Sequence, residues 1–309
     1  IGEIFSALKK WITAEGGYTL NERILLDIRL PRAILTLLVG ASLAVGGVLM
    51  QGLFLNPIVE PGLIGTSSGA AFGASLYFVF GAVFTYHFGE WTLPVMACIG
   101  AIIATFLVFF LSESKHKGKT NITQLLLTGI AVNAIFLSGI GFLSYLARDP
   151  QARSITFWSL GSMSGSNWHA VIIVGLSTIL CILIAMRFAK QLNTLLLGTI
   201  EAHHLGINVK RLKLKILFLN VVLVAVATSF IGIIGFVGLI VPHLMRLLKG
   251  SDNRNLIIGS AIMGGLLLSI ADLLARLLLA PAELPIGIVT TIVGAPIFIY
   301  LLRKNQYHF

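Results

Sequence analysis

Long apolar runs, separated by short polar stretches, fill most of this chain of 309 residues. A helix needs about 20 apolar residues to cross the hydrocarbon core of a bilayer. On that criterion we place membrane spans near residues 31–55, 62–80, 91–111, 122–146, 169–189, 212–232, 234–249, 256–279 and 285–302. The pattern predicts an all-α polytopic membrane protein, a multi-helix bundle with about nine transmembrane helices.

The scarcity of charge supports a membrane protein. Only 11% of the residues are charged and 57% are hydrophobic, whereas a soluble domain carries roughly 25% charged residues. The net charge of +10 is compatible with a nucleic-acid partner, but basic residues of membrane proteins gather in cytoplasmic loops. We therefore expect membrane lipid and no nucleic acid around this chain. Cys98 and Cys181 lie inside apolar runs and are expected to be packed, reduced thiols, and we expect no metal site.

The loop charges also predict an orientation. With the C-terminus in the cytoplasm, most lysines and arginines fall in inner loops, as the positive-inside rule requires. Nine spans then place residue 1 outside, so we expect residues 1–28 to form an extracytoplasmic segment before a helical bundle at 31–302. No signal-peptide pattern explains an outer start, and we expect a first helix to be missing from this sequence.

Small residues and prolines mark places where helices pack closely or break. Gly65, Gly69 and Gly73 recur every four residues, on one face of a helix, where they let two backbones approach closely. Packing within one subunit and a role in lining a pore are both open. The proline-bearing stretches LNPIVEPG, IVPH and AELPIG interrupt or cap helices at span ends. Broken helices at membrane depth are tolerated where they are buried in protein or line a cavity. These stretches therefore indicate a translocation path through the protein.

The motifs of the common enzyme classes are missing from the sequence. It contains no G-x-x-x-x-G-K-[ST] loop for ATP and neither H-E-x-x-H nor G-x-S-x-G, so we expect no catalytic residues. Asp272 is the one acid that we place inside a span, four residues before Arg276 on the same helical face, where the two can pair. An ion-driven carrier usually needs unpaired carboxylates in the membrane. A secondary transporter driven by an ion gradient is therefore the weaker alternative.

Several stretches carry a resemblance to a known family. Residues 28–70, IRLPRAILTLLVGASLAVGGVLMQGLFLNPIVEPGLIGTSSGA, resemble the permease subunits of iron-siderophore, haem and vitamin B12 ABC importers, the FecCD-type or type II importers. FWSLGS, LGTIEAHHLGI, GFVGLIVPHLMRLL and AELPIGIVTTIVGAPIFIYLL follow in the order of the family. The resemblance covers nearly the whole chain and implies one permease domain over residues 1–309. The family has ten spans, and this sequence is expected to begin just after the first.

The resemblance implies a set of partners. These are a second copy of the permease, in a homodimer with the translocation path on its two-fold axis, and two ATPase subunits at the cytoplasmic face. A periplasmic or lipid-anchored substrate-binding protein would dock outside the bacterial inner membrane. ATP and Mg²⁺ would bind the ATPase, and no cofactor would bind this chain. The expected substrate is an iron complex. Haem and a ferric siderophore are expected about equally, and vitamin B12 is the less expected substrate.

The family also implies which helices line the path. They correspond to the spans that begin near residues 62, 122 and 285, and the polar candidates on them are Asn133, Ser138, Thr290 and Thr291.

The polar stretch at residues 195–211 interrupts the apolar pattern. Thr199 is expected to cap a short helix over residues 200–205, and Gly206 suits the left-handed position that ends one. Six helical residues span about 9 Å, too little to cross a bilayer. By the predicted orientation this segment is a cytoplasmic loop, and in the family it is the coupling helix that fits a groove of the ATPase. Adjacent histidines on a helix point about 100° apart, unlike the i, i+4 pairs that bind metals.

The coupling interpretation implies a role for each residue of the segment. The residues assigned to it are Gly198, Ile200, Glu201, Ala202, His203, Leu205 and Gly206, of which Ile200, Ala202 and Leu205 would make the apolar contact. An inert loop is the alternative.

Two arginines lie at the predicted outer end of a span, whereas most basic residues of this chain fall in predicted inner loops. Arg29 and Arg32 can snorkel to lipid headgroups. In the family, arginines at these two positions and at the position of Arg276 meet glutamates of the binding protein, which implies a docking patch.

Overall fold

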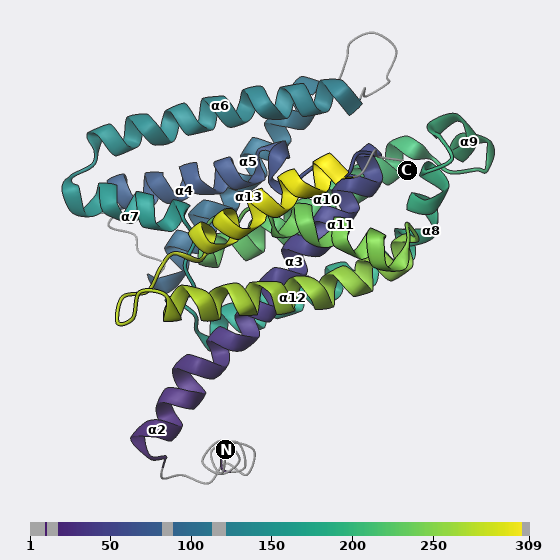
Figure 1. Cartoon of the computed structure of the whole chain (residues 1–309). Coiled ribbons are helices and arrows are strands. Elements are labelled where there is room, and N and C mark those ends of the chain that lie inside the picture. The colour runs from purple at the N-terminus through teal and green to yellow at the C-terminus, as the bar shows by residue number, and fades with distance from the viewer. Residues whose placement is uncertain (1–9, 11–17, 82–88, 113–121, 305–309) are drawn as a thin grey trace.

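The computed structural model describes residue 10 and residues 18–81, 89–112 and 122–304, and the regular elements in these ranges are all helical (Figure 1). The elements are α2 (Leu20–Arg23), η1 (Ile24–Arg29), α3 (Leu30–Phe54), η2 (Pro61–Ile64), α4 (Thr66–Phe80), η3 (Gly89–Trp91), α5 (Thr92–Ser112), α6 (Ile122–Leu146), α7 (Asp149–Ser159), α8 (Trp168–Leu195), α9 (Thr199–His204), α10 (Val209–Ile231), α11 (Val237–Lys249), α12 (Asn253–Leu277) and α13 (Ile286–Lys304).

Each predicted span coincides with a helix, which confirms the all-α fold class. Among the described residues, six helical stretches are long and apolar enough to cross a membrane. They are the continuous stretch Leu20–Phe54, the stretch Gly89–Ser112, and the helices α6, α8, α10 and α12. By contrast, α4 has 15 residues and α11 has 13, and at 1.5 Å per residue both are shorter than the hydrocarbon core of about 30 Å.

The first span begins earlier than the sequence indicated. Thr19 and Glu22 form a capping box, in which the Thr19 hydroxyl accepts from the Glu22 N–H and the Glu22 carboxylate accepts from the Thr19 N–H. The chain stays helical from Leu20 into α3. The last residues of the predicted segment 1–28 are therefore part of the first long helix, and residues 1–9 and 11–17 lie outside the described residues.

The helix α7 was not predicted as a separate element. Its sequence, DPQARSITFWS, is too polar and too short for a span, and it begins with Pro150 in the first turn, where the missing N–H of proline costs nothing. It connects α6 to the loop before α8, at the opposite end of the bundle from α9 (Figure 1). We call these two ends of the bundle the α7 end and the α9 end.

The central helix is α3, which packs against α8, α10, α11 and α12. Close contacts with two of these neighbours need glycine. A Cβ atom on Gly40 would lie 2.2 Å from the carbonyl oxygen of Gly264 in α12, and a Cβ on Gly47 would lie 1.8 Å from that of Gly238 in α11. Such backbone contact is how helices pack in a bilayer, where apolar side chains gain little by leaving lipid.

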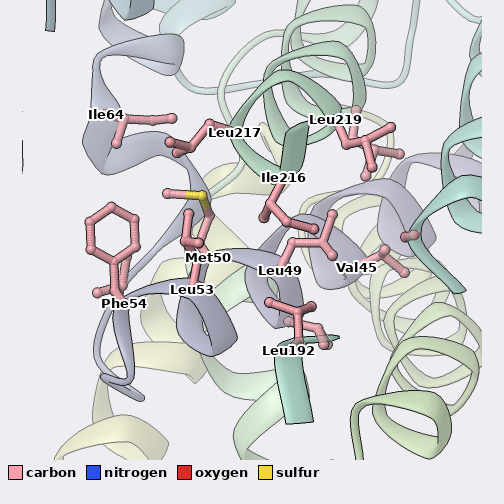
Figure 2. Packing of buried hydrophobic residues seen from close by; sticks show 14 of the residues in the cluster. Val45, Leu49, Met50, Leu53, Phe54, Ile64, Leu192, Ile216, Leu217 and Leu219 are labelled. Carbon is pink, nitrogen blue, oxygen red and sulfur yellow. The ribbon is translucent and has the colours of Figure 1, made fainter. Parts of the chain in front are cut away.

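Large side chains fill the core on the side of α3 that faces α10. Figure 2 shows Leu49 and Met50 of α3 beside Ile216 and Leu217 of α10, with Leu192 of α8 below them. These five side chains are all at most 2% exposed. The core therefore packs the C-terminal part of α3 against both helices that flank α9 in sequence.

The glycines of the GTSSGAAFG stretch face α5 of the same chain. A Cβ on Gly69 would lie 2.4 Å from the Gly100 carbonyl oxygen, and one on Gly73 would lie 2.1 Å from that of Met96. Gly65 instead precedes α4 with a left-handed backbone, at φ +88°. The close approach that the spacing predicts is thus made within one subunit.

Replacing Gly69 by valine is expected to destabilise the protein by about 1–3 kcal/mol, the usual cost of forcing extra atoms into a packed interface. The measurement is the shift in thermal unfolding of the detergent-solubilised protein. Gly141→Val in α6 is the matched control, because no atom lies within 4 Å of a Cβ at Gly141. An equal loss of stability in both variants would contradict the packing role.

Candidate functional site

The helix α9 protrudes from the bundle between α8 and α10 (Figure 1). Gly198 precedes it at φ +120° and is its N-cap, so Thr199 is the first helical residue rather than the predicted cap. A Cβ at Gly198 would lie 2.1 Å from a carboxylate oxygen of Glu201. Gly206 follows at φ +82°, which confirms the left-handed end.

Two of the three residues predicted to make the apolar contact of α9 are exposed, and the third, Ala202, is not. Ile200 is 67% exposed and Leu205 is 65% exposed, whereas Ala202 is fully buried against its own chain. Ala202 therefore cannot supply a contact to a partner, because it belongs to the buried hydrophobic core, where α9 packs against α8 and α10. Leu197, before the helix, is 65% exposed. Three exposed aliphatic side chains at a charged end of a molecule form a patch suited to a protein partner.

The polar residues of α9 surround this patch. Glu201, His203 and His204 are all exposed. The two imidazole rings lie edge to face with their centroids 6.4 Å apart. The patch thus has a charged rim next to an apolar centre, the arrangement found in protein interfaces.

A cluster of amides joins the last turn of α8 to the start of α12, close to α9 in sequence. The side-chain N–H of Asn193 donates to the Asp252 carboxylate at 2.7 Å. The side-chain oxygen of Asn193, Oδ1, accepts from the backbone N–H and the side-chain N–H of Asn253, at 2.8 Å each. The amides of Asn193 and Arg254 hold the pKa of Asp252 below its usual value. We call these three residues, Asn193, Asp252 and Asn253, the α8–α12 clasp.

The α7 end carries a network of two arginines and two acids. The Nε and Nη2 atoms of Arg32 donate to Asp272, with a shortest distance of 2.8 Å, and Nη1 donates to both oxygens of Glu283 at 2.9 Å. Arg276 pairs with Asp272 at 3.2 Å, which confirms the pair predicted from their spacing. We call Arg32, Asp272, Arg276 and Glu283 the α7-end ion network.

The three predicted docking arginines differ in their surroundings. The Arg32 side chain is only 13% exposed because two carboxylates enclose it, whereas that of Arg276 is 38% exposed. Arg29 is exposed, three residues before Arg32 on the same continuous helix. The structure thus joins Arg32 and Arg276 through Asp272 and leaves Arg29 outside this network.

The four predicted path residues divide into two pairs. Asn133 of α6 accepts a hydrogen bond from Ser68 and donates to the Leu63 carbonyl oxygen, so it holds α6 against the start of α4. Thr290 is 5% exposed and donates to the Gly287 carbonyl oxygen of its own helix. Ser138 and Thr291 are exposed, on α6 and α13 respectively. Of the four, only Ser138 and Thr291 are exposed in the single chain.

Glu60, an acid in the stretch between two predicted spans, lies between helices. Glu60 is half-buried, and its carboxylate accepts from the backbone N–H of Phe236, the residue before α11, at 3.0 Å. The next residue, Pro61, packs against Gly238 and accepts from the side-chain amide of Asn220 at 3.2 Å. The only sequence signal was an acid bracketed by two prolines in LNPIVEPG.

The comparison with known proteins identifies the family. Residues 1–304 match the FecCD transport family. The chain belongs to this family. Its relatives include the hemin transport system permease protein HmuU of Yersinia pestis, 41% identical over 92% of this chain and 84% of the relative. The cobalamin import system permease protein BtuC of Halobacterium salinarum is 40% identical over 90% of this chain and 73% of the relative.

Solved structures agree with this membership of the FecCD family. A metal-chelate type ABC transporter in an inward-facing conformation has a TM-score of 0.84 and 32% identity, with 98% of each chain covered. PsaBC from Streptococcus pneumoniae, in complex with a Fab, has a TM-score of 0.61 at 18% identity, over 92% of this chain and 98% of that one, and shares the fold. The prediction of a membrane permease of this family is thereby confirmed.

Proposed function

We propose that this FecCD-family chain is the permease subunit of an ATP-driven importer that carries an iron complex across the bacterial inner membrane. The observation that carries the proposal is the 41% identity to a hemin permease over nearly the whole chain. Haem and ferric siderophore are the leading substrates, and vitamin B12 follows them because cobalamin permeases are almost as similar. A secondary transporter remains the alternative, but no observation favours it.

The charge distribution supports a cytoplasmic α9 end. Lys210, Arg211, Lys249 and Arg254 are exposed there, and basic residues favour the cytoplasmic side of a membrane. In this orientation the exposed Ile200 and the rest of the α9 patch would dock in a groove of an ATPase, as a short amphipathic helix does. The C-terminus would be cytoplasmic and the α7 end would face the binding protein.

Two permease copies would enclose the path. The helix α6 is the least buried of the six long apolar helices, and both α6 and α13 expose aliphatic side chains together with Ser138 and Thr291. A second copy placed against these helices would bring two sets of these hydroxyls to a shared axis. ATP binding would then close the ATPase pair and move α9, and the path would open alternately to either side.

Reconstitution tests the proposed function. The chain is placed in nanodiscs with the ATPase and the binding protein encoded beside it, and ATP hydrolysis is measured with haem, a ferric siderophore or cobalamin on the binding protein. Stimulation by one loaded binding protein supports the proposal and names the substrate. Transport that follows an ion gradient without the ATPase would support the secondary transporter instead.

Reversing the charge at Arg29 is expected to weaken docking of the binding protein by about three- to tenfold, because an exposed charge pair is worth up to about 1 kcal/mol and also steers association. The measurement is the affinity of the binding protein for the reconstituted transporter, at low and high salt. Arg153→Glu, an exposed arginine of α7 at the same end, is the control. An unchanged affinity for the Arg29 variant would refute its role in docking.

A further inference from the structure

The expected path helices α6 and α13 pack on different neighbours. The helix α6 contacts α4, α5, α7 and η2, whereas α13 contacts α11 and α12. Residues 60–65, which contain η2 and lead into α4, touch both sets of helices. We call these residues the segment 60–65. It forms a short connection between the surroundings of α6 and those of α13.

This segment lies beside the middle of two long helices. The side-chain amide of Asn220 donates to the Pro61 carbonyl oxygen at 3.2 Å, and that of Asn133 donates to the Leu63 carbonyl oxygen at 3.0 Å. Asn220 is at the middle of α10 and Asn133 is near the middle of α6, and both helices are long and apolar enough to cross a membrane. The loop after α3 thus returns to membrane depth before α4 begins. Glu60 is therefore an ionisable residue at that depth, where such residues are costly and mark functional positions.

On one side, the segment 60–65 holds α6. The side-chain amide of Asn133 donates to the Leu63 carbonyl oxygen, and its oxygen accepts from the hydroxyl of Ser68 in α4. Gly129, one turn earlier in α6, comes so close that a Cβ there would lie 2.6 Å from the same Leu63 carbonyl oxygen. The backbone of α6 thus packs directly on the backbone at Leu63.

On the other side, the segment 60–65 reaches α13 through Phe236. The Glu60 carboxylate accepts from the Phe236 N–H at 3.0 Å. Phe236 has a left-handed backbone, at φ +69°, which is uncommon for a residue other than glycine, so this hydrogen bond holds a conformation that the residue itself disfavours. The Phe236 side chain contacts Gly294 of α13, where a Cβ would lie 2.7 Å from the Phe236 Cβ. The position of Phe236 therefore determines how closely α13 can pack.

We propose that the segment 60–65 couples the positions of α6 and α13, and that Glu60 is the positioning residue on the α13 side. This inference rests on the proposed importer function, in which these two helices line the path. Glu60 keeps Phe236 against Gly294, and three residues later Leu63 keeps α6 in place. A movement of either helix is thereby passed to the other through a short piece of backbone.

The test measures how firmly α13 is held. Thr290, which is 5% exposed, lies one turn before Gly294 on the same face of α13. Thr290→Cys is introduced into a chain whose Cys98 and Cys181 are replaced, and the chain is placed in nanodiscs with and without the ATPase. The readout is the rate at which a charged thiol reagent modifies position 290. Thr291→Cys, at an exposed position, reports the rate for an accessible thiol.

Glu60→Met removes the acceptor and keeps a side chain of similar size. It is expected to raise the modification rate at position 290 about tenfold, because losing a charge-assisted hydrogen bond favours local opening by that order. Glu60→Gln keeps an oxygen that can accept from Phe236, so the rate should rise less than about threefold. Glu90→Met, which removes an exposed carboxylate at the start of α5, is the control and should leave the rate unchanged.

Asn133→Ala distinguishes coupling from a local contact. It removes the hydrogen bond between α6 and Leu63 without touching α13, yet it should raise the rate at position 290 about threefold, because residues in one network share their energies. In proteoliposomes with the ATPase and a loaded binding protein, Glu60→Met should lower the substrate transported per ATP, and Glu60→Gln should retain it.

An unchanged rate at position 290 in Glu60→Met or in Asn133→Ala would overturn the proposal. If Glu60→Met does not fold, Asn133→Ala decides on the same readout. If a loaded binding protein does not stimulate the parent chain, the importer function fails, but the modification rates still decide whether the segment 60–65 couples the two helices.

Discussion

Replacing Ile200 or Leu205 by glutamate is expected to weaken the association of the ATPase by about 30-fold or more and to abolish transport. The reason is that both side chains are about two-thirds exposed at the centre of the α9 patch, and a buried charge at the centre of an interface costs at least about 2 kcal/mol. The measurement is co-purification of the ATPase with the permease, followed by its hydrolysis rate in nanodiscs.

The matched control for these variants is Leu279→Glu. Leu279 is 56% exposed but lies in the loop after α12, at the α7 end. The same chemical change there should leave the ATPase bound. If Ile200→Glu and Leu205→Glu also retain the ATPase, α9 is not the coupling element and the inert loop becomes the better interpretation.

Asn193→Ala in the α8–α12 clasp is expected to lower stability by about 2 kcal/mol, because the amide makes several hydrogen bonds, each worth about 1 kcal/mol. It should also reduce the amount of substrate transported per ATP, because α9 would then move without α12. The measurements are thermal unfolding in detergent and the ratio of transport to hydrolysis in proteoliposomes.

A swap of side chains tests the clasp more sharply. Asn193→Asp alone would set a second carboxylate against Asp252, which is 2.7 Å from the Asn193 amide, and should be worse than alanine. Adding Asp252→Asn restores one amide and one carboxylate in exchanged positions, and asparagine still caps α12. Recovery of both stability and coupling in the double variant is the expected result. No recovery would show that the clasp does not depend on this hydrogen bond.

The sequence predicted those features that depend on local patterns. The length of an apolar run locates a helix, and for that reason all nine predicted spans coincide with helices. The backbone at Gly206 and the pairing of Asp272 with Arg276 depend on neighbours a few residues away, and both were predicted correctly. The start of the first helix at Leu20 was missed because its first ten residues, LNERILLDIR, carry four charges and do not form an apolar run.

Features that depend on distant segments could not be predicted. Ala202 has the same apolar character as Ile200, and only the packing of α9 against α8 and α10 decides that one is buried and the other exposed. The partners of Arg32 are 240 and 251 residues away in the sequence, and no local spacing reveals such pairs. The clasp at Asn193 was missed for the same reason, with its partners about 60 residues distant.

The carboxylate of Glu60 has a consequence for how this protein tolerates non-helical chain between α10 and α11. The hydrocarbon of a bilayer contains no water to accept a hydrogen bond from an exposed peptide N–H, and Phe236, with φ at +69°, lies just outside the regular turns of α11. Glu60, in a loop 176 residues earlier in the chain, accepts a hydrogen bond from that N–H. The Glu60 carboxylate thereby takes the place of a water molecule at this break. The backbone at Phe236 can leave the helical conformation without leaving its N–H unpaired.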